Sequence, residues 1–282
     1  MDYHRDRFED HSLMIFKNEA LVALLPTHLL NKSLVSHNGL TYGGLIVDNN
    51  FDQSDIKLLF DSVFSYCKLN GFKQLILKTM PNFYQNKSQE KIEGYLKQIC
   101  EAKLDKKRVL AIDYSQPLTI HKTKLKHFRK HQATDFIIKK ENTFKLFWNK
   151  VLIPLLKEKH NTKPVHSLGE IELLNSQFPK EIVQYNVYCQ DKILAGITIF
   201  DKGNIVKSQY GAATKLGKKT RALEYLFLNL IFKFKQEEKT FFSMGTVIDK
   251  SFPEGYNTGL YKQKKELGCS DYTQNCYNLP IV

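Results

Sequence analysis

Residues 182–245 read IVQYNVYCQDKILAGITIFDKGNIVKSQYGAATKLGKKTRALEYLFLNLIFKFKQEEKTFFSMG, and this stretch decides the fold. Its first part alternates short runs of β-branched and aromatic residues with turn-forming residues, which predicts successive strands. Its later part has the apolar spacing of a helix. The expected elements are strands at 182–189, 193–200, 205–210 and 241–245, turns at 190–192 and 201–204, and a helix at 222–235.

The segment that leads into this helix is small and basic: Gly211-Ala-Ala-Thr-Lys-Leu-Gly-Lys-Lys-Thr-Arg221. Free backbone amides and the positive end of the helix dipole meet at such a place, so it suits a phosphate. Gly217 permits close backbone approach, and Arg221 can hold a phosphate with two hydrogen bonds. The alternative is a solvated loop without a ligand. The predicted phosphate-loop residues are Lys215, Gly217, Lys218, Lys219, Thr220 and Arg221.

The composition indicates a folded, basic protein. The chain has 282 residues, 42% hydrophobic and 12% aromatic, enough for one large or two ordinary domains. The net charge of +13 suits a phosphate-bearing ligand, a nucleic acid or an anionic membrane face, although ordinary solubility explains it equally well.

The sequence also predicts a cellular location. Five cysteines without a C-x-x-C pair predict free thiols in a reducing compartment. The polar beginning of the chain is not a signal peptide, and no apolar run reaches the roughly 20 residues of a membrane span. We expect a cytoplasmic protein, with peripheral contact to the inner membrane face left open.

Outside this stretch, turn and capping signals predict the remaining elements. A helix is expected at 52–70, where apolar residues repeat at three and four positions and Gly71 follows the end. Ser167 and Glu170 have the spacing of a capping box. Further expected elements are strands at 12–16, 20–26, 40–47, 72–78, 108–114 and 272–279, a helix at 143–159 kinked at Pro154, and a helix at 257–267.

Two parts of the chain resemble each other. Asn18–Ala23 is similar to Gln190–Ala195, and Tyr42–Gly44 is similar to Tyr210–Ala212, at spacings of 172 and 168 residues. An amphipathic helix and a short strand follow in both places, so we interpret the pattern as a structural duplication. The predicted division is 1–134 and 135–282.

The two predicted halves differ in charge where the helix begins. The first carries the acidic segment 48–55, and the second carries the basic phosphate-loop residues. Coulomb attraction alone favours an anion at the second site. We therefore expect one cofactor site, in the second half, and a structural or acceptor-binding role for the first.

A strand pair, a small-residue loop, a helix and a strand resemble the core of the Gcn5-related N-acetyltransferase (GNAT) fold. Two such units resemble the FemABX group of tandem-GNAT acyl and aminoacyl transferases. The resemblance implies an α+β protein of two GNAT-like units, each a mixed, mostly antiparallel sheet flanked by helices. The segments that carry the FemABX resemblance are Leu110–Ser115, Leu125–His131, Phe136–Ile138, Phe144–Trp148, Phe242–Gly245 and Gly259–Gly268.

The resemblance implies an N-acyltransferase, similar to FemAB-like enzymes of surface-polysaccharide gene clusters. It would transfer an acetyl group from acetyl-CoA to an amino sugar or nucleotide sugar, so a small amine acceptor, nucleotide- or lipid-linked, is expected. Two departures concern the loop, where residues 214–222 contain only Gly217, and the first unit, which is expected to be incomplete. Alternatives are an aminoacyl-tRNA-dependent transferase of the peptidoglycan type and a catalytically inactive tandem-GNAT binding module.

The family's chemistry assigns roles to further residues. Tyr261 is the expected general acid and Glu224 the expected base, against the plainer readings of a packed aromatic and a surface carboxylate. No metal is expected, because the basic surroundings of His127 and His131 oppose one. The remaining cofactor-binding candidates are Gln209, Tyr210, Gly211, Ala212 and Ala213, and the substrate-binding candidates are Tyr42, Arg129, Lys130 and Asn257.

Overall fold

The computed structural model describes residues 2–48, 51–99, 104–132, 135–249 and 251–282. The chain forms two compact units. Unit 1 consists of Met1–Arg108 with Tyr272–Val282, and unit 2 consists of Val109–Asp271. The predicted division between residues 134 and 135 differs from these bounds and stays a prediction, and residues 133 and 134 lie outside the described residues.

The main sheet of unit 1 has the order β3-β4-β6-β13, and α1 and α2 pack on it. β3 and β4 are antiparallel, β4 and β6 are parallel, and β6 and β13 are antiparallel. A smaller sheet has the order β1-β2-β5. The elements are η1 (Asp2–His4), β1 (Leu13–Lys17), β2 (Ala20–Leu25), β3 (Thr27–Leu30), β4 (Ser33–Ser36), β5 (Ile46–Val47), α1 (Gln53–Leu69), β6 (Gln74–Lys78), η2 (Asn82–Tyr84), α2 (Lys87–Ile99) and β13 (Ser270–Pro280).

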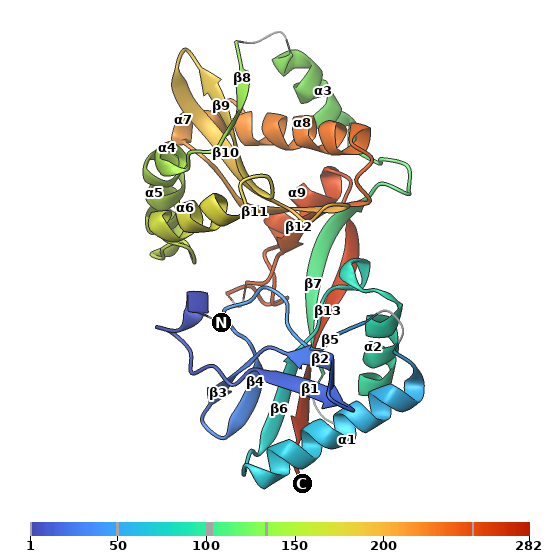
Figure 1. Ribbon diagram of the computed structural model, residues 1–282. Coiled ribbons are helices and arrows are strands. Elements are labelled where there is room, and N and C mark those ends of the chain that lie inside the picture. The colour runs from blue at the N-terminus through green and yellow to red at the C-terminus, as the bar shows by residue number, and fades with distance from the viewer. Residues whose placement is uncertain (1, 49–50, 100–103, 133–134, 250) are drawn as a thin grey trace. The chain divides into compact units, whose positions relative to one another are not determined.

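The sheet of unit 2 has the order β7-β12-β11-β10-β9-β8. Its core places α8 and α3 against one group of strand residues, and α4, η3, α5 and α6 against another (Figure 1). The elements are β7 (Leu104–Asp113), α3 (Lys122–His131), β8 (Ile137–Glu141), α4 (Lys145–Phe147), the π-helix η3 (Trp148–Leu152), α5 (Ile153–His160), α6 (Leu168–Gln177), β9 (Ile182–Cys189), β10 (Lys192–Asp201), β11 (Ile205–Ala213), α7 (Lys215–Lys219), α8 (Ala222–Gln236), β12 (Phe241–Thr246) and α9 (Thr258–Glu266).

The predicted duplication is visible in the backbone. Asn18 and Glu19 have φ values of 49° and 65°, and Gln190 and Asp191, 172 residues later, have 47° and 60°. Both pairs are two-residue hairpin turns with positive φ, the geometry that fits the twist of the flanking strands. In each unit a hairpin strand then pairs in parallel with the strand that follows the long helix, β4 with β6 and β11 with β12.

One strand of each sheet comes from a distant part of the chain. β7 follows α2 of unit 1, but its residues up to Asp113 pair with β12 of unit 2. β13 follows α9 of unit 2, but residues Cys276–Pro280 pair with β6 of unit 1. The units therefore divide within these strands, at residues 108 and 271, because strand pairing decides which sheet each strand completes.

Two predicted elements differ in detail, for local reasons. The strand expected at 40–47 is reduced to β5, because Gly44 has a φ of +89° and interrupts the extended backbone. The helix expected at 143–159 has a π-helical turn directly before Pro154. Proline has no N–H to donate, so the hydrogen-bond ladder is rearranged there.

Other predictions hold. Ser167 and Glu170 form the predicted capping box, and α1 ends at Leu69, with Asn70 as its C-cap and Gly71, whose φ is +70°, directly after it. Among the described residues, no helix combines the length and apolar character that crossing a bilayer requires. Cys67, Cys189, Cys269 and Cys276 are free, and Cys100 lies outside the described residues.

Gly196 of β10 tests the packing under α4. A Cβ added there would lie 2.4 Å from Asn186 Oδ1 and 2.5 Å from a ring carbon of Phe147. We expect Gly196→Ala to lower the free energy of unfolding by about 1–3 kcal/mol in denaturant titrations, because a filled core must shift. Gly169→Ala in α6 is the control: nothing lies within 4 Å of a Cβ added at that position, so stability should be unchanged or slightly higher. Equal effects of both variants would contradict tight packing at Gly196.

Candidate active site

β11 and β12 pair over a short distance and then separate. Their parallel register is limited to Ile205↔Phe241, Val206↔Phe242 and Lys207↔Ser243 among the described residues. On its other side β11 has a bulge, because Thr198 pairs with Tyr210 while Ile199 pairs with Ser208, which leaves Gln209 without an opposite residue. Bulges of this kind are common beside active sites, where they redirect backbone groups. We call the place where the two strands diverge the β11–β12 splay.

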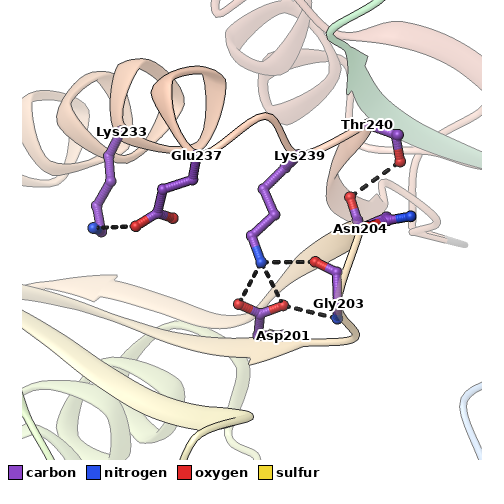
Figure 2. A network of polar contacts seen from close by, with 7 residues as sticks. All are labelled: Asp201, Gly203, Asn204, Lys233, Glu237, Lys239 and Thr240. Atoms are coloured by element: carbon purple, nitrogen blue, oxygen red, sulfur yellow. Dashed lines mark hydrogen bonds and ion pairs between the residues drawn. The ribbon is translucent and has the colours of Figure 1, made fainter.

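The paired end of these strands is held by a polar clamp (Figure 2). Lys239 Nζ contacts the carboxylate oxygens of Asp201 at 2.8 and 2.9 Å and donates to the carbonyl oxygen of Gly203 at 2.7 Å. The backbone N–H and hydroxyl of Thr240 both donate to the carbonyl oxygen of Asn204, at 2.7 and 3.0 Å. The clamp therefore joins the start of β11 to the start of β12, and the strands can diverge only at their other ends.

Two lysines with lowered pKa values lie near the splay. Lys207 occupies the last paired position of β11, and its Nζ donates to Gln209 Oε1. Lys264 of α9 is buried and donates to the carbonyl oxygens of Met244 and Thr246 at 2.6 and 2.9 Å. The pKa of each lysine is lowered to about 8, mainly by burial, and the nearby charge of Lys264 contributes to this lowering for Lys207. Both amines can therefore exchange protons near neutral pH.

Neither lysine stands out in the sequence. The chain has 42 lysines and arginines, so a single lysine carries little information. A usable signal for Lys207 was its position within the strand Ile205–Ala213, in a hairpin that is otherwise largely apolar. Lys264 gave no such signal, because its burial depends on the packing of α9 against the end of β12.

The predicted phosphate loop is largely folded into β11 and α7. Thr214 caps α7, and its Oγ1 accepts from the backbone N–H of Gly217 at 3.0 Å. The N–H of Lys218 donates to the Thr214 carbonyl oxygen, and the N–H of Thr220 donates to that of Leu216, both at 2.9 Å. These amides are therefore already used within the chain.

Gly217 has a packing role in this arrangement. An added Cβ would lie 2.0 Å from the carbonyl oxygen of Leu194 in β10, so only glycine lets α7 lie against that strand. The side chains of Lys215, Lys218 and Lys219 are exposed, and Lys215 forms an ion pair with Glu158 at 3.2 Å. The lysines of α7 are thus exposed charges, and Gly217 allows α7 to pack closely against β10.

Glu224 lies in a buried ion cluster at the start of α8. Glu224 is 8% exposed, and its Oε2 lies 2.6 Å from Lys124 Nζ of α3. His127 Nδ1 lies 3.4 Å from Oε1, and Arg221 Nη1 lies 2.9 Å from that same ring nitrogen. Lys124 also contacts Glu266 at 3.2 Å. A negative side chain in the first turn is favourable for the helix dipole, so α8 carries its own anion there.

This arrangement does not fit the pyrophosphate of coenzyme A. The amides of Gly217, Lys218 and Thr220 are used internally, and the first turn of α8 already contains the carboxylate of Glu224. A pyrophosphate there would have to compete with the Glu224 carboxylate for the cations Lys124 and Arg221. Arg221, the expected clamp, instead contacts His127 within the chain.

The other cofactor candidates lie along the second half of β11. Gln209 is the bulge residue beside Lys207. The hydroxyl of Tyr210 lies 2.6 Å from His166 Nδ1 and accepts from the His166 N–H at 3.1 Å, with the Trp148 ring edge-on. Gly211 is exposed, whereas Ala212 and Ala213 are buried in the core. Of this group, Gln209 is the residue that the structure brings together with an ionisable side chain at the splay.

The candidates on α9 have identifiable contacts. The Tyr261 hydroxyl donates to Asp271 Oδ2 at 3.2 Å, and its ring meets Tyr256 edge-on. Asn257 caps α9, because its Oδ1 accepts from the Leu260 N–H at 2.8 Å. General acid and substrate-binding roles for these two residues stay predictions.

The remaining substrate candidates lie in different units. Tyr42 belongs to unit 1, where its ring contacts that of Tyr84 at 4.8 Å. Arg129 and Lys130 are exposed on α3 of unit 2. Their joint action on one substrate therefore stays a prediction.

Comparisons with known proteins bear on the fold. No model of a protein family matches the sequence, and no curated protein matches it. The solved structure of FemX is similar, with a TM-score of 0.66 at 8% identity over 99% of this chain and 90% of FemX. L-PGS from Bacillus licheniformis gives 0.63 at 12% identity, over 96% of this chain and 84% of L-PGS.

A tandem GNAT protein from the clavulanic acid biosynthesis pathway is also similar. Its TM-score is 0.50 at 8% identity, over 96% of this chain and 82% of that protein. At these identities the likeness shows the fold. It confirms the predicted fold class, a FemABX-like tandem GNAT fold with a mixed sheet flanked by helices in each unit.

The ion cluster at α8 predicts an unequal cost of removing two carboxylates. Glu224→Gln should lower the free energy of unfolding by about 2–3 kcal/mol, because the largely buried ammonium group of Lys124 loses its closest partner. Glu237→Gln, at the other end of α8, removes the exposed ion pair with Lys233 shown in Figure 2 and should change stability by less than about 0.5 kcal/mol. Urea titrations of both variants measure this, and equal costs would show that Glu224 is solvated.

Proposed function

We propose that this chain is an aminoacyl transferase, which moves an acyl group from the ester of an aminoacyl-tRNA to an amine acceptor at the β11–β12 splay. The observation that carries the choice of donor is the buried Glu224–Lys124 pair in the first turn of α8. It occupies the position at which the sequence predicts a CoA pyrophosphate. The likeness to FemX and L-PGS is as compatible with a tRNA-borne donor as with acyl-CoA.

The exposed charges support a long polyanion as the donor. α3 has no buried residue, and four of its cations are exposed. Three exposed cations follow on α7, and Arg221 connects the two helices by contacting His127. Cations spread over two helices match successive phosphates of a nucleic acid better than one compact pyrophosphate. We call this set the α3–α7 basic surface: Lys122, Lys126, Arg129, Lys130, Lys215, Lys218 and Lys219.

The chemistry follows from the groups at the splay. The acceptor amine attacks the ester carbonyl, an amide bond forms, and the ester bond to the ribose oxygen breaks. Neutral Lys207 takes the proton of the attacking amine, and the resulting ammonium group gives this proton to the leaving ribose oxygen as the ester bond breaks. Backbone amides at the Gln209 bulge stabilise the oxyanion of the tetrahedral intermediate. Burial and, as the smaller cause, the charge of Lys264 keep the pKa of Lys207 low, and Lys264 also fixes α9 to the end of β12.

Acetyl-CoA-dependent N-acetylation of an amino sugar or nucleotide sugar is the second candidate. The observation that favours it is the likeness to the tandem GNAT protein, together with the half-exposed guanidinium of Arg221 before α8. This route requires the Glu224 cluster to rearrange when the pyrophosphate binds. The two candidate functions therefore differ in the acyl donor that the protein binds: aminoacyl-tRNA in the first and acetyl-CoA in the second.

Donor binding separates the two candidates. The full chain should bind tRNA with an affinity that falls steeply as salt rises, and CoA at millimolar concentration should give no saturable heat in calorimetry. Lys126→Ala with Arg129→Ala should reduce the slope of log K against log salt by about 2. Lys57→Ala with Lys68→Ala, on exposed positions of α1, removes the same charge and should change the slope less. Saturable CoA binding without tRNA binding would overturn the proposal in favour of acetylation.

The pH dependence of transfer tests Lys207. Its lowered pKa means that the neutral amine becomes abundant as pH rises towards about 8, so the rate should rise with pH and level off above that value. Lys207→Met should remove this rise together with at least about 100-fold of the rate. Lys264→Met should move the rise to higher pH, because a charge that lowers the pKa of Lys207 is lost. An unchanged profile in Lys207→Met would exclude Lys207 as the base.

A further inference from the structure

Unit 1 contains a small, partly open cavity beside α2. Its volume is about 20 Å³, enough for one water-sized group. It lies between the chain at Gly43 and Gly44, the end of β6 at Thr79, and the α2 residues Ile92 and Glu93. The described residues that line it include no lysine, arginine or histidine, so its only charged side chain is the carboxylate of Glu93.

One oxygen of this carboxylate lacks a partner among the described residues. Glu93 is 6% exposed, and its Oε1 accepts from Asn275 Nδ2 and from the Tyr277 hydroxyl, both on β13. Oε2 is buried and has no hydrogen-bond partner in the described part of the chain. The side-chain oxygen of Asn275 is likewise buried and unpartnered there. Two bare acceptors therefore lie in one buried cluster, and one of them belongs to a group that borders the cavity.

In unit 2 a second glutamate is held by an asparagine and a tyrosine in the same way, an arrangement that we call the Asn-x-Tyr clamp. There, both carboxylate oxygens have partners. Asn186 and Tyr188, again two residues apart on a strand, both donate to Glu141. There both carboxylate oxygens are engaged, Oε1 at 3.2 Å and Oε2 at 2.9 Å from the Tyr188 hydroxyl. The Asn-x-Tyr clamp thus provides hydrogen bonds to both carboxylate oxygens of Glu141 but only to Oε1 of Glu93. The clamp alone does not require the bare oxygen.

A partner that donates hydrogen bonds and carries positive charge would both satisfy this oxygen and compensate the charge of the carboxylate. A buried carboxylate without a counter-charge is costly, and a neutral water would supply donors but no charge. Divalent metal ions require several oxygen ligands or a charged cluster, and the described residues contain no group of three or more His, Cys, Asp or Glu side chains placed to hold a metal. An ammonium group is the size of a water molecule and has three or four donors.

We propose that the Glu93 cavity binds a primary ammonium group, with Glu93 Oε2 as its counter-ion. The ligand is either free ammonium or the head group of a primary alkylamine. Quaternary ammonium groups are excluded, because methyl groups do not fit the volume and offer no N–H donors. This site lies wholly in unit 1 and does not depend on the transfer reaction of unit 2.

Thermal unfolding of the full chain at constant ionic strength tests the site. Ammonium chloride should raise the Tm of unit 1 saturably, by at least about 2 °C, because a ligand of the native state stabilises it by mass action. Methylamine hydrochloride distinguishes the sources: a similar rise indicates an alkylamine head group, and no rise indicates free ammonium. Tetramethylammonium chloride and potassium chloride should give no saturable rise.

Two variants assign the effect to Glu93. Glu93→Gln keeps the shape of the side chain and should abolish the ammonium-dependent rise, whereas Glu141→Gln, in the matching clamp of unit 2, should retain it. The ion selectivity of the unaltered chain is decisive even if Glu93→Gln fails to fold. Equal responses to ammonium, potassium and tetramethylammonium, or no response to any of them, would overturn the proposal and leave a buried water in the cavity.

Discussion

The short parallel pairing of β11 with β12 is the constraint on which the candidate active site depends. Asp201 and Lys239 hold the strands together at one end, and three residue pairs later the pairing stops. Two strands fixed at one end must leave backbone groups unpaired where they diverge. The bulge at Gln209 and the amine of Lys207 lie at that point, so the site results from incomplete sheet formation and not from an added loop.

Charge in unit 2 is sorted by depth. Glu224 and Lys124 neutralise each other inside the unit. The lysines of α7 are exposed, and α3 contains no buried residue. Burying an ion without a partner is expensive, so Glu224 is paired with Lys124, whereas the buried Lys264 donates to backbone carbonyl oxygens and has a lowered pKa. The exposed cations of α3 and α7 are therefore accessible to a large anion.

The sequence predicts local geometry well and tertiary roles poorly. The hairpin turns at Asn18 and Gln190 follow from turn chemistry, and the duplication follows from their spacing. Gly217 was expected to face a ligand, but it packs against Leu194, a contact that depends on where β10 lies. Glu224 was expected to be a base or a surface carboxylate, because no sequence pattern reveals that α3 places Lys124 beside it. The exchange of β7 and β13 between the sheets depends on pairing between distant residues, which periodicity does not encode.

The position of β13 has a consequence for biosynthesis. β6 lacks its antiparallel neighbour until residues 276–280 exist, and all of residues 109–271 are translated first. At ~5–20 residues per second, that interval lasts on the order of 10–30 s, during which the edge of β6 is open to incorrect pairing on the ribosome. Unit 1 is thus the earlier of the two to be synthesised and the later to be completed. Chaperone protection of this nascent edge would matter more for yield than the stability of either finished unit.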